Sequence, residues 1–162
     1  MAIGAFACAL FSPAAAYSDL DILNFALQLE CLEASFYTYA AFGVGLTEAQ
    51  RGGGPQAEGG MRAQLGEYQG AAEQIALEEQ RHVDLLRAAL GKAAVPCPLI
   101  NLDKAFADAA NAALGTTLSP PFSPYASYLK FLHGALLFED TGVFAYNGAI
   151  GAIRDPGALR WW

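Results

Sequence analysis

The chain has 162 residues, of which 54% are hydrophobic and 15% charged, and its formal net charge is -7 at pH 7. This length suits one domain with a real core, and the composition excludes a disordered chain. The acidic balance excludes nucleic acid as a partner, because phosphate binding needs a basic face. No apolar run reaches the roughly 18 residues of a transmembrane helix, so no transmembrane segment is predicted.

Residues 1–16 have features of a secretory signal peptide. An apolar block over residues 1–11 is followed by Ser-Pro and three alanines, a small-residue pattern that suits cleavage after Ala16. No Lys or Arg precedes Arg51, so the positive region that usually opens such a peptide is missing. A frayed apolar tail or a mis-started gene is the alternative. We expect a secreted or extracytoplasmic protein, and otherwise a cytoplasmic one.

The three cysteines leave the redox compartment open. Cys8 would be removed together with a signal peptide. Cys31 and Cys97 would then remain, either as a disulfide pair or as two free thiols.

The first predicted helix covers residues 18–42. It begins at Ser18, with Asp21 three residues later as a capping-box partner, and it ends before Gly43. A glycine-rich loop over residues 51–60 follows.

The second predicted helix covers residues 61–90 and is closed by Gly91, after which two prolines prevent its continuation. A shorter amphipathic helix over residues 102–114 opens near Asn101 and ends at Gly115. It is long enough to carry the chain across a bundle.

The last long helix is predicted to begin at Ser123 as N-cap, with Pro124 in the first helical position. It ends before Asp155-Pro156. No strand-like alternation competes with the helical pattern. Three long helices and one short crossover helix therefore predict an all-α bundle.

Each long helix carries a carboxylate on the seam that is expected to face the core. The seam of the second helix comprises Leu65, Tyr68, Ala72, Ile75, Glu79, His82, Leu86 and Leu90. The seam of the first comprises Leu23, Leu27, Glu30, Ala34 and Tyr37, with Glu33 on nearly the same side. The seam of the third comprises Tyr128, Leu132, Ala135, Glu139, Gly142, Tyr146 and Ile150.

Carboxylates that are clustered in an apolar core need a cation or hydrogen bonds to remain ionised. Iron and manganese with oxygen and imidazole ligands are the usual occupants of such sites in helical bundles. We therefore predict a metal site, in which Glu79 is placed to bridge two ions and Tyr37 to bond Glu139. Its predicted ligands are Glu30, Glu79, His82 and Glu139.

Each residue of this pattern, considered alone, also has an interpretation that does not involve a metal. Taken alone, Glu79 with His82 is more often a solvated or core-satisfied pair than a metal site. Glu33 and Glu78 are more often supporting or surface residues than ligands, and His133 is read as packing or surface. The remaining aromatic residues of interest are read as core aromatics, namely Tyr125, Tyr128 and Tyr146.

Three parts of the chain resemble the desiccation-related ferritin-like proteins of plants, algae and bacteria. These are residues 19–37, the glycine-rich loop around 52–55 with the run 78–82, and residues 138–149. Together they cover about residues 18–150, and the combination is far more specific than any one motif.

The resemblance implies a ferritin-like four-helix bundle with a carboxylate-bridged di-metal centre. Glu30, Glu79, His82 and Glu139 match the ligands that the family draws from its first three helices. The fourth helix of the family usually supplies another Glu-x-x-His, and no such motif follows residue 139. We therefore expect a truncated domain over residues 17–155 without the fourth helix, followed by a tail outside the family over residues 156–162.

A missing fourth helix would leave a long apolar groove, which we expect a homodimer or a partner helix to cover. It would also leave the metal site incomplete. The expected function is a desiccation- or stress-related protein that binds or oxidises Fe(II), like a ferroxidase or di-iron oxidase if it is active. The alternative is a non-catalytic protective or interaction scaffold with a vestigial site. A third reading is that the chain is a fragment of a longer gene whose remaining ligands lie downstream.

Overall fold

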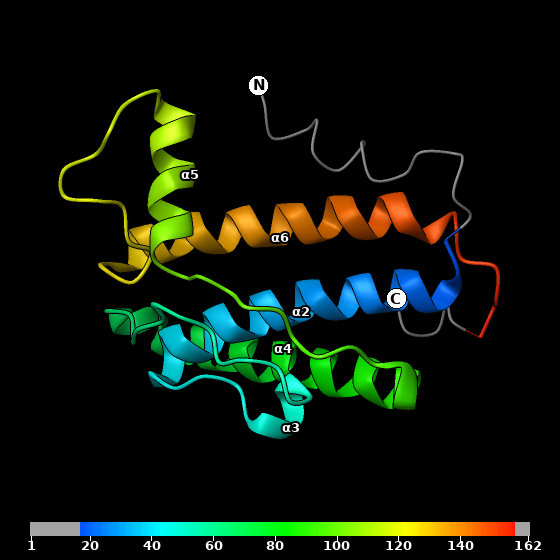
Figure 1. Ribbon diagram of the computed structural model, residues 1–162. Coiled ribbons are helices and arrows are strands. Elements are labelled where there is room, and N and C mark those ends of the chain that lie inside the picture. Colours follow the sequence, from blue (N-terminus) through cyan, green and yellow to red (C-terminus); the bar gives the residue numbers. More distant parts are fainter. Residues whose placement is uncertain (1–16, 158–162) are drawn as a thin grey trace.

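The computed structural model describes residues 17–157, and its described part is built of helices without strands. Figure 1 shows α2 lying between α4 and α6, with neighbouring long helices running in opposite directions. None of the described helices is both long and apolar enough to cross a membrane. The prediction of an all-α bundle with three long helices is confirmed. The elements are α2 (Asp19–Phe42), α3 (Glu48–Arg51), α4 (Gln69–Leu90), α5 (Lys104–Leu114) and α6 (Tyr128–Ile150), with 3₁₀ turns at Gly66–Tyr68 and Gly91–Ala93.

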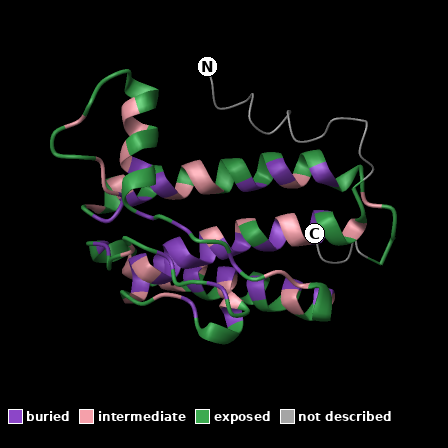
Figure 2. Cartoon of the chain, viewed as in Figure 1, coloured by how far each residue is buried: buried purple, intermediate pink, exposed green. Residues whose placement is uncertain are grey.

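Both ends of α2 follow the sequence signals. The Ser18 hydroxyl accepts the backbone N–H of Asp21 at 3.2 Å, and the Asp21 carboxylate accepts the backbone N–H of Ser18 at 2.9 Å. At the other end Gly43 has φ +74°, a left-handed conformation that suits glycine, and its N–H bonds the carbonyl of Tyr39. As the central helix, α2 buries residues on several sides, which Figure 2 shows in purple.

The predicted start of the second helix is wrong by about two turns. Gly66 has φ +55°, and the N–H of Ala63 donates to the carbonyl of Ala40 at 2.9 Å. This contact holds the chain before Gly66 against the end of α2, so α4 begins only at Gln69. Leu65 is buried as predicted, but it precedes the helix.

The predicted start of the last helix is also wrong, by one turn. The N-cap is Ser127, whose side chain accepts the N–H of Lys130 at 3.4 Å, whereas Ser123 accepts the N–H of Tyr125 within a turn. The helix ends at Ile150 rather than near residue 154. Beyond it, the backbone N–H groups of residues 154 and 155 donate to the carboxylate of Asp19, which draws the chain onto the start of α2.

An aromatic cluster holds α5 and α6 on α2. Phe36 lies at its centre, with 5.1 to 5.8 Å between its ring centroid and those of its aromatic neighbours Tyr37, Phe106, Tyr125, Phe131 and Phe138. Such contacts combine a large buried apolar area with favourable ring geometry. The cluster fixes the position of α6 beside the end of α2 where Tyr37 lies.

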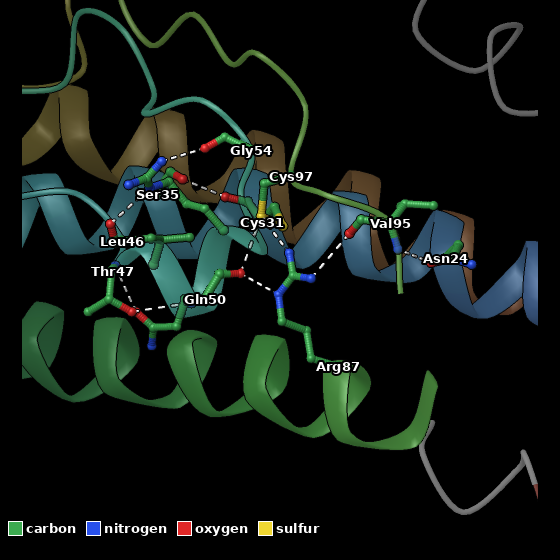
Figure 3. Close-up of a disulfide and its surroundings, with 11 residues drawn as sticks. Asn24, Cys31, Ser35, Leu46, Thr47, Gln50, Gly54, Arg87, Val95 and Cys97 are labelled. Carbon is green, nitrogen blue, oxygen red and sulfur yellow. Dashed lines mark hydrogen bonds between the residues drawn. A yellow bond between two sulfur atoms is a disulfide. The ribbon is translucent and has the colours of Figure 1, made fainter. Parts of the chain in front are cut away.

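The sequence did not decide whether Cys31 and Cys97 are paired. In the structure they form a disulfide, which links α2 to the segment that follows α4. Figure 3 shows Arg87 of α4 reaching the same segment. Its guanidinium donates to the carbonyl of Val95 at 3.2 Å and to Cys97 Sγ at 3.3 Å, and also to the carbonyl of Gln50. These bonds and the disulfide link the middle of α2 to the C-terminal end of α4.

The predicted signal peptide over residues 1–16 lies outside the described residues. So do residues 158–162, which form most of the tail predicted over residues 156–162.

Candidate metal centre

Three of the four predicted ligands lie together between α2 and α4. His82 Nδ1 is 3.2 Å from Glu30 Oε2 and 3.1 Å from Glu79 Oε2. Ligand atoms of the three side chains lie within 4.8 Å of one another. Glu79 and His82 share a face because they are three residues apart on α4, and Glu30 faces them from α2. Two carboxylate oxygens and one imidazole nitrogen thus converge on one point.

The expectation that His82 points into the core is wrong. Glu30 and Glu79 are buried, but the side chain of His82 is 52% exposed and lies at the rim of the cluster. The imidazole therefore forms the solvent-exposed edge of the three-residue cluster.

Glu139, the fourth predicted ligand, lies on α6 outside this three-residue cluster. Tyr37 donates its hydroxyl hydrogen to Glu139 Oε1 at 2.7 Å, which confirms the predicted hydrogen bond. Glu139 is exposed, however, so its predicted place on a buried seam is wrong. Leu132 and Ile150 of that seam are exposed too. The helix instead packs through a narrower stripe, comprising Phe131, Gly134, Gly142, Ala145 and Ala149.

Tyr146 was predicted as a core aromatic, but its hydroxyl donates to Glu30 Oε1. The two tyrosine bonds are reciprocal, because Tyr37 of α2 bonds Glu139 of α6 and Tyr146 of α6 bonds Glu30 of α2. The signal was present in the sequence, since the spacing Glu-x₆-Tyr occurs at Glu30 and again at Glu139. On antiparallel helices that repeated spacing brings each tyrosine opposite the other helix's glutamate.

Glu33 was read as a supporting or surface residue, and the structure buries it to 7% exposure against the same cavity. Burial, followed by the negative charges of Glu30, Glu79 and Glu139, raises the pKa of Glu33 to about 9. Its carboxyl is therefore protonated at neutral pH when no cation is bound.

Charge and burial act differently on the three clustered side chains. Burial disfavours ionisation of Glu30, but hydrogen bonds from His82 and Tyr146 outweigh it and lower the pKa of that carboxyl. Burial raises the pKa of Glu79. Hydrogen bonds to Glu30 and then to Glu79 raise the pKa of His82 to about 10. In the absence of metal the cluster thus holds protons that a cation would displace.

The cluster opens into a cavity of about 370 Å³ between α2, α4 and α6. Its polar lining consists of the four glutamates with His82, Tyr146 and Asn147, and its apolar lining comes from Leu85, Leu86, Gly142 and Val143. The cavity has room for more than one ion or for a small oxidant. Carboxylate oxygens and imidazole nitrogen form a donor set that suits iron and manganese, so the residues fit such an ion.

Comparisons with known proteins show that this chain is similar to ferritin-like proteins. The model of the ferritin-like domain matches residues 18–161. Desiccation-related protein PCC13-62 of Craterostigma plantagineum is 35% identical over 144 residues, which cover 86% of this chain and 45% of that protein. Ferritin-like catalase Nec2 of Nesocodon mauritianus is 33% identical over 148 residues, which cover 88% of this chain and 47% of that protein. The chain therefore spans about half the length of the curated relatives it matches. No solved structure matches it significantly.

Proposed function

This chain belongs to the ferritin-like domain family, and we propose that it is a desiccation- or stress-related member that binds iron or manganese. The proposed ligands are Glu30, Glu79 and His82, with Glu139 on the opposite side of the cavity. The observation that carries the proposal is the convergence of two buried carboxylates and one imidazole within 4.8 Å. Among the relatives, one is named a desiccation-related protein, which supports the stress-related role.

We propose further that the site oxidises Fe(II), because another relative is named a ferritin-like catalase and peroxide is the substrate of a catalase. In this reaction Fe(II) is the substrate, and two Fe(II) ions would give two electrons to the oxidant. If the oxidant is hydrogen peroxide, it takes up two protons and leaves as two water molecules. If the oxidant is dioxygen, it takes up two protons and leaves as hydrogen peroxide. Glu79 belongs to the cluster and also lines the cavity, so it would be the residue to bridge two ions. Glu33, whose pKa burial raises to about 9, holds a proton beside the cavity and is the group placed to deliver protons there.

The second candidate is a non-catalytic protective or interaction scaffold with a vestigial site. It is favoured by the hydrogen bonds that satisfy the cluster without a cation. Tyr146 bonds Glu30, Tyr37 bonds Glu139, and His82 lies between Glu30 and Glu79. With protons on the buried carboxyls, these bonds would hold the three helices together in a metal-free protein.

Metal content separates the two candidates. We expect the protein, loaded anaerobically with Fe(II) and dialysed, to retain at least one iron per chain by elemental analysis. Glu79→Ala and His82→Ala should each lose this iron while keeping the helical circular dichroism spectrum. Glu78→Ala and His133→Ala are matched controls that remove the same groups away from the cavity, and they should retain it.

Folded wild-type protein without bound metal would refute the first candidate and leave the scaffold. Once iron is retained, oxidation is followed by the absorbance of Fe(III) after addition of hydrogen peroxide. Loaded protein that oxidises Fe(II) no faster than the His82→Ala variant would refute the oxidase proposal alone.

We also propose that the protein is secreted or extracytoplasmic. The disulfide Cys31–Cys97 supports this location, because disulfides persist in oxidising compartments and are rare in the cytosol. Fractionation of the producing cells tests it, with the protein expected outside the cytoplasmic fraction.

A further inference from the structure

The disulfide lies directly beside the candidate metal cluster in the sequence of α2. Cys31 follows Glu30, which supplies one carboxylate of the cluster, and its partner Cys97 comes from the segment after α4. The Cα atoms of the two cysteines are 5.8 Å apart, so this segment lies against α2 next to Glu30. A movement of the segment is therefore transmitted to the part of α2 that carries a proposed ligand.

Arg87 connects the same segment to the helix that carries the other two ligands. It lies five residues after His82 on α4, which corresponds to about 7.5 Å along the helix axis. Its guanidinium donates to Cys97 Sγ at 3.3 Å and also to the backbone of the segment. A guanidinium holds its donors in a fixed plane, so these bonds constrain both the position and the orientation of α4. The disulfide and Arg87 thus form a continuous link from Glu30 to His82.

The glycine-rich loop closes over this link. A Cβ atom at Gly54 would lie 2.9 Å from the backbone nitrogen of Cys97, and a Cβ atom at Gly52 would meet the guanidinium of Arg87. Glycine therefore lets the loop pack closely on both groups, and Cys31 and Cys97 are only 0% and 3% exposed. A reductant reaches the sulfur atoms only when the loop opens, so the state of the pair is set mainly while the chain folds.

The packing and the charges around the cluster explain why such a link is needed. Metal binding requires Glu30 and Glu79 as carboxylates and His82 as a neutral imidazole, and two carboxylates on facing helices repel each other. Small side chains form shallow ridges, which fix the axial position of one helix against another less firmly than large side chains do. Both helices bury small side chains within about two turns of the ligands, namely Ala26, Ala34, Ala72 and Ala76.

From the continuous link and the small side chains around the cluster, we propose that the disulfide Cys31–Cys97 and Arg87 act as a redox-dependent clasp. The clasp holds the three ligands of the cluster opposite one another, so that the cluster binds its divalent ion tightly only when the disulfide is formed. Its members are positioning residues, because they act through the ligands. This inference rests on the proposed function, since the clasp serves the metal centre proposed there.

Reduction opens the clasp at its covalent bond. With a dithiol as the reductant, the two thiols of the reductant become a disulfide, the bond between Cys31 and Cys97 breaks, and each of the two sulfur atoms gains one hydrogen. The segment after α4 is then no longer joined to α2 beside the cluster. A chain that is still reduced would hold its ion weakly, and it would acquire that ion after it reaches an oxidising compartment.

The test compares the affinity of the oxidised and the reduced full chain for Mn(II) alone. Dithiothreitol reduces the disulfide and is removed by anaerobic gel filtration, so that it does not compete for the ion during isothermal titration calorimetry. We expect the reduced protein to keep its helical circular dichroism spectrum and to bind Mn(II) roughly tenfold more weakly, or weaker still, as when groups that orient a ligand are lost.

A second measurement uses the reciprocity of linked equilibria. If the disulfide strengthens Mn(II) binding, then saturation with Mn(II) must make the disulfide harder to reduce by the same factor. Alkylation of Cys31 and Cys97 in defined mixtures of reduced and oxidised dithiothreitol, followed by mass spectrometry, measures this factor.

Arg87→Met tests the clasp while the disulfide is intact. It removes the guanidinium but keeps an unbranched side chain, so the affinity for Mn(II) should fall as it does on reduction. Lys92→Met removes an exposed cation just after α4 and should bind like the wild type. Phe106→Ala removes a buried ring of α5 that does not line the cavity. It controls for a general loss of stability and should also bind like the wild type.

The outcomes separate this inference from the proposed function. Equal Mn(II) affinity of the oxidised and reduced wild type would overturn the clasp and leave the metal site. An equal loss of affinity in Phe106→Ala and Arg87→Met would also overturn it, because lost stability would then explain both. If the reduced chain does not remain folded, Arg87→Met decides, and wild-type affinity in that variant overturns the clasp. Oxidised, folded wild type that binds no Mn(II) would overturn the proposed function and this inference together.

Discussion

Two of the carboxylates in the cavity, those of Glu30 and Glu139, are each oriented by one tyrosine from the neighbouring helix. The Tyr146 hydroxyl donates to Oε1 of Glu30, so the other carboxylate oxygen, Oε2, faces His82 and lies 3.2 Å from its Nδ1. Tyr37 does the same for Oε1 of Glu139. Partners of this kind hold a ligand in its binding orientation, and their removal typically weakens metal affinity.

Tyr146→Phe should therefore weaken binding of the ion held by Glu30, Glu79 and His82 by roughly 10- to 100-fold. Without the hydroxyl, the Glu30 carboxylate rotates more freely, although the ring still fills its place. The measurement is Mn(II) affinity by isothermal titration calorimetry. Tyr128→Phe is the control, because Tyr128 stacks on Tyr68 away from the cavity and should bind like the wild type. Equal affinities for the two variants would contradict an orienting role of Tyr146.

Glu33 should make the metal-free protein less stable as the pH rises. Its pKa is raised to about 9 in the folded protein, from an ordinary 4.5, so between these values the folded state binds more protons than the unfolded state. The free energy of unfolding must then fall as the pH increases from about 4.5 to 9. The raised pKa values of Glu79 and His82 act in the same direction, whereas the lowered pKa of Glu30 acts in the opposite one.

Glu33→Gln is the variant that measures this contribution. The amide is neutral at every pH, so the variant should be more stable than the wild type at pH 8 and its stability should depend less on pH. Urea unfolding at pH 5 and at pH 8, with metal removed by chelation, measures both effects. A wild-type protein whose unfolding midpoint rises between these pH values would contradict the prediction.

At the scale of the elements, α2 is held in place by a disulfide that helical periodicity and capping residues do not predict. The disulfide joins Cys31, the residue directly after Glu30, to a segment that Asn24 and Arg87 also hold. Asn24 accepts the N–H of Val95 and donates to the carbonyl of Ala93, both at 2.9 Å. The segment after α4 is thus fastened along the middle of α2, where the cluster is built.

Cys31→Ser combined with Cys97→Ser should lower the free energy of unfolding by roughly 4 kcal/mol, since the cross-link closes a loop with a sequence separation of 66. Urea unfolding measures this difference, and the wild type with excess reductant gives an independent value. If reduction leaves the unfolding midpoint of the wild type unchanged, the cross-link does not contribute to stability.

At the scale of the whole molecule, the described residues, 17–157, cover α6 on one side only. Figure 2 shows much of its surface exposed, and its exposed apolar residues include Leu129, Leu132, Leu136, Val143, Phe144 and Ile150. Their exposed fractions range from 43% to 70%. Apolar groups that are gathered along one helix in this way are typical of a surface that binds another protein. We propose that a second copy of the chain covers this face, with a helix of another protein as the alternative.

Light scattering should then give twice the 17.1 kDa mass of one chain. Phe144→Glu, at the most exposed of these positions, should lower the mass to that of a monomer, because it places a charge in the apolar contact. Ala109→Glu adds the same charge on exposed α5 and should leave the dimer intact. A monomeric wild type that is stable in solution would refute the dimer and leave the partner helix as the occupant.

The sequence by itself determined the helices and most of the residues of the candidate centre. Helical periodicity and capping are local properties, so Ser18, Asp21 and Gly43 were sufficient to place both ends of α2. The three-residue spacing of Glu79 and His82 placed both side chains on one face of α4 for the same reason. The predicted hydrogen bond of Tyr37 with Glu139 is confirmed, although Glu139 is exposed and not on a buried seam.

Only the tertiary structure decided how the helices are rotated against one another. The glycines of α6 bring its narrow stripe close to α2, which leaves Glu139 exposed and turns Tyr146 toward Glu30. That rotation also buries Glu33 opposite Gly142. The pairing of Cys31 with Cys97 likewise depends on segments that are distant in the sequence. These features arise from packing between side chains of different helices, and the periodicity of one helix does not contain that information.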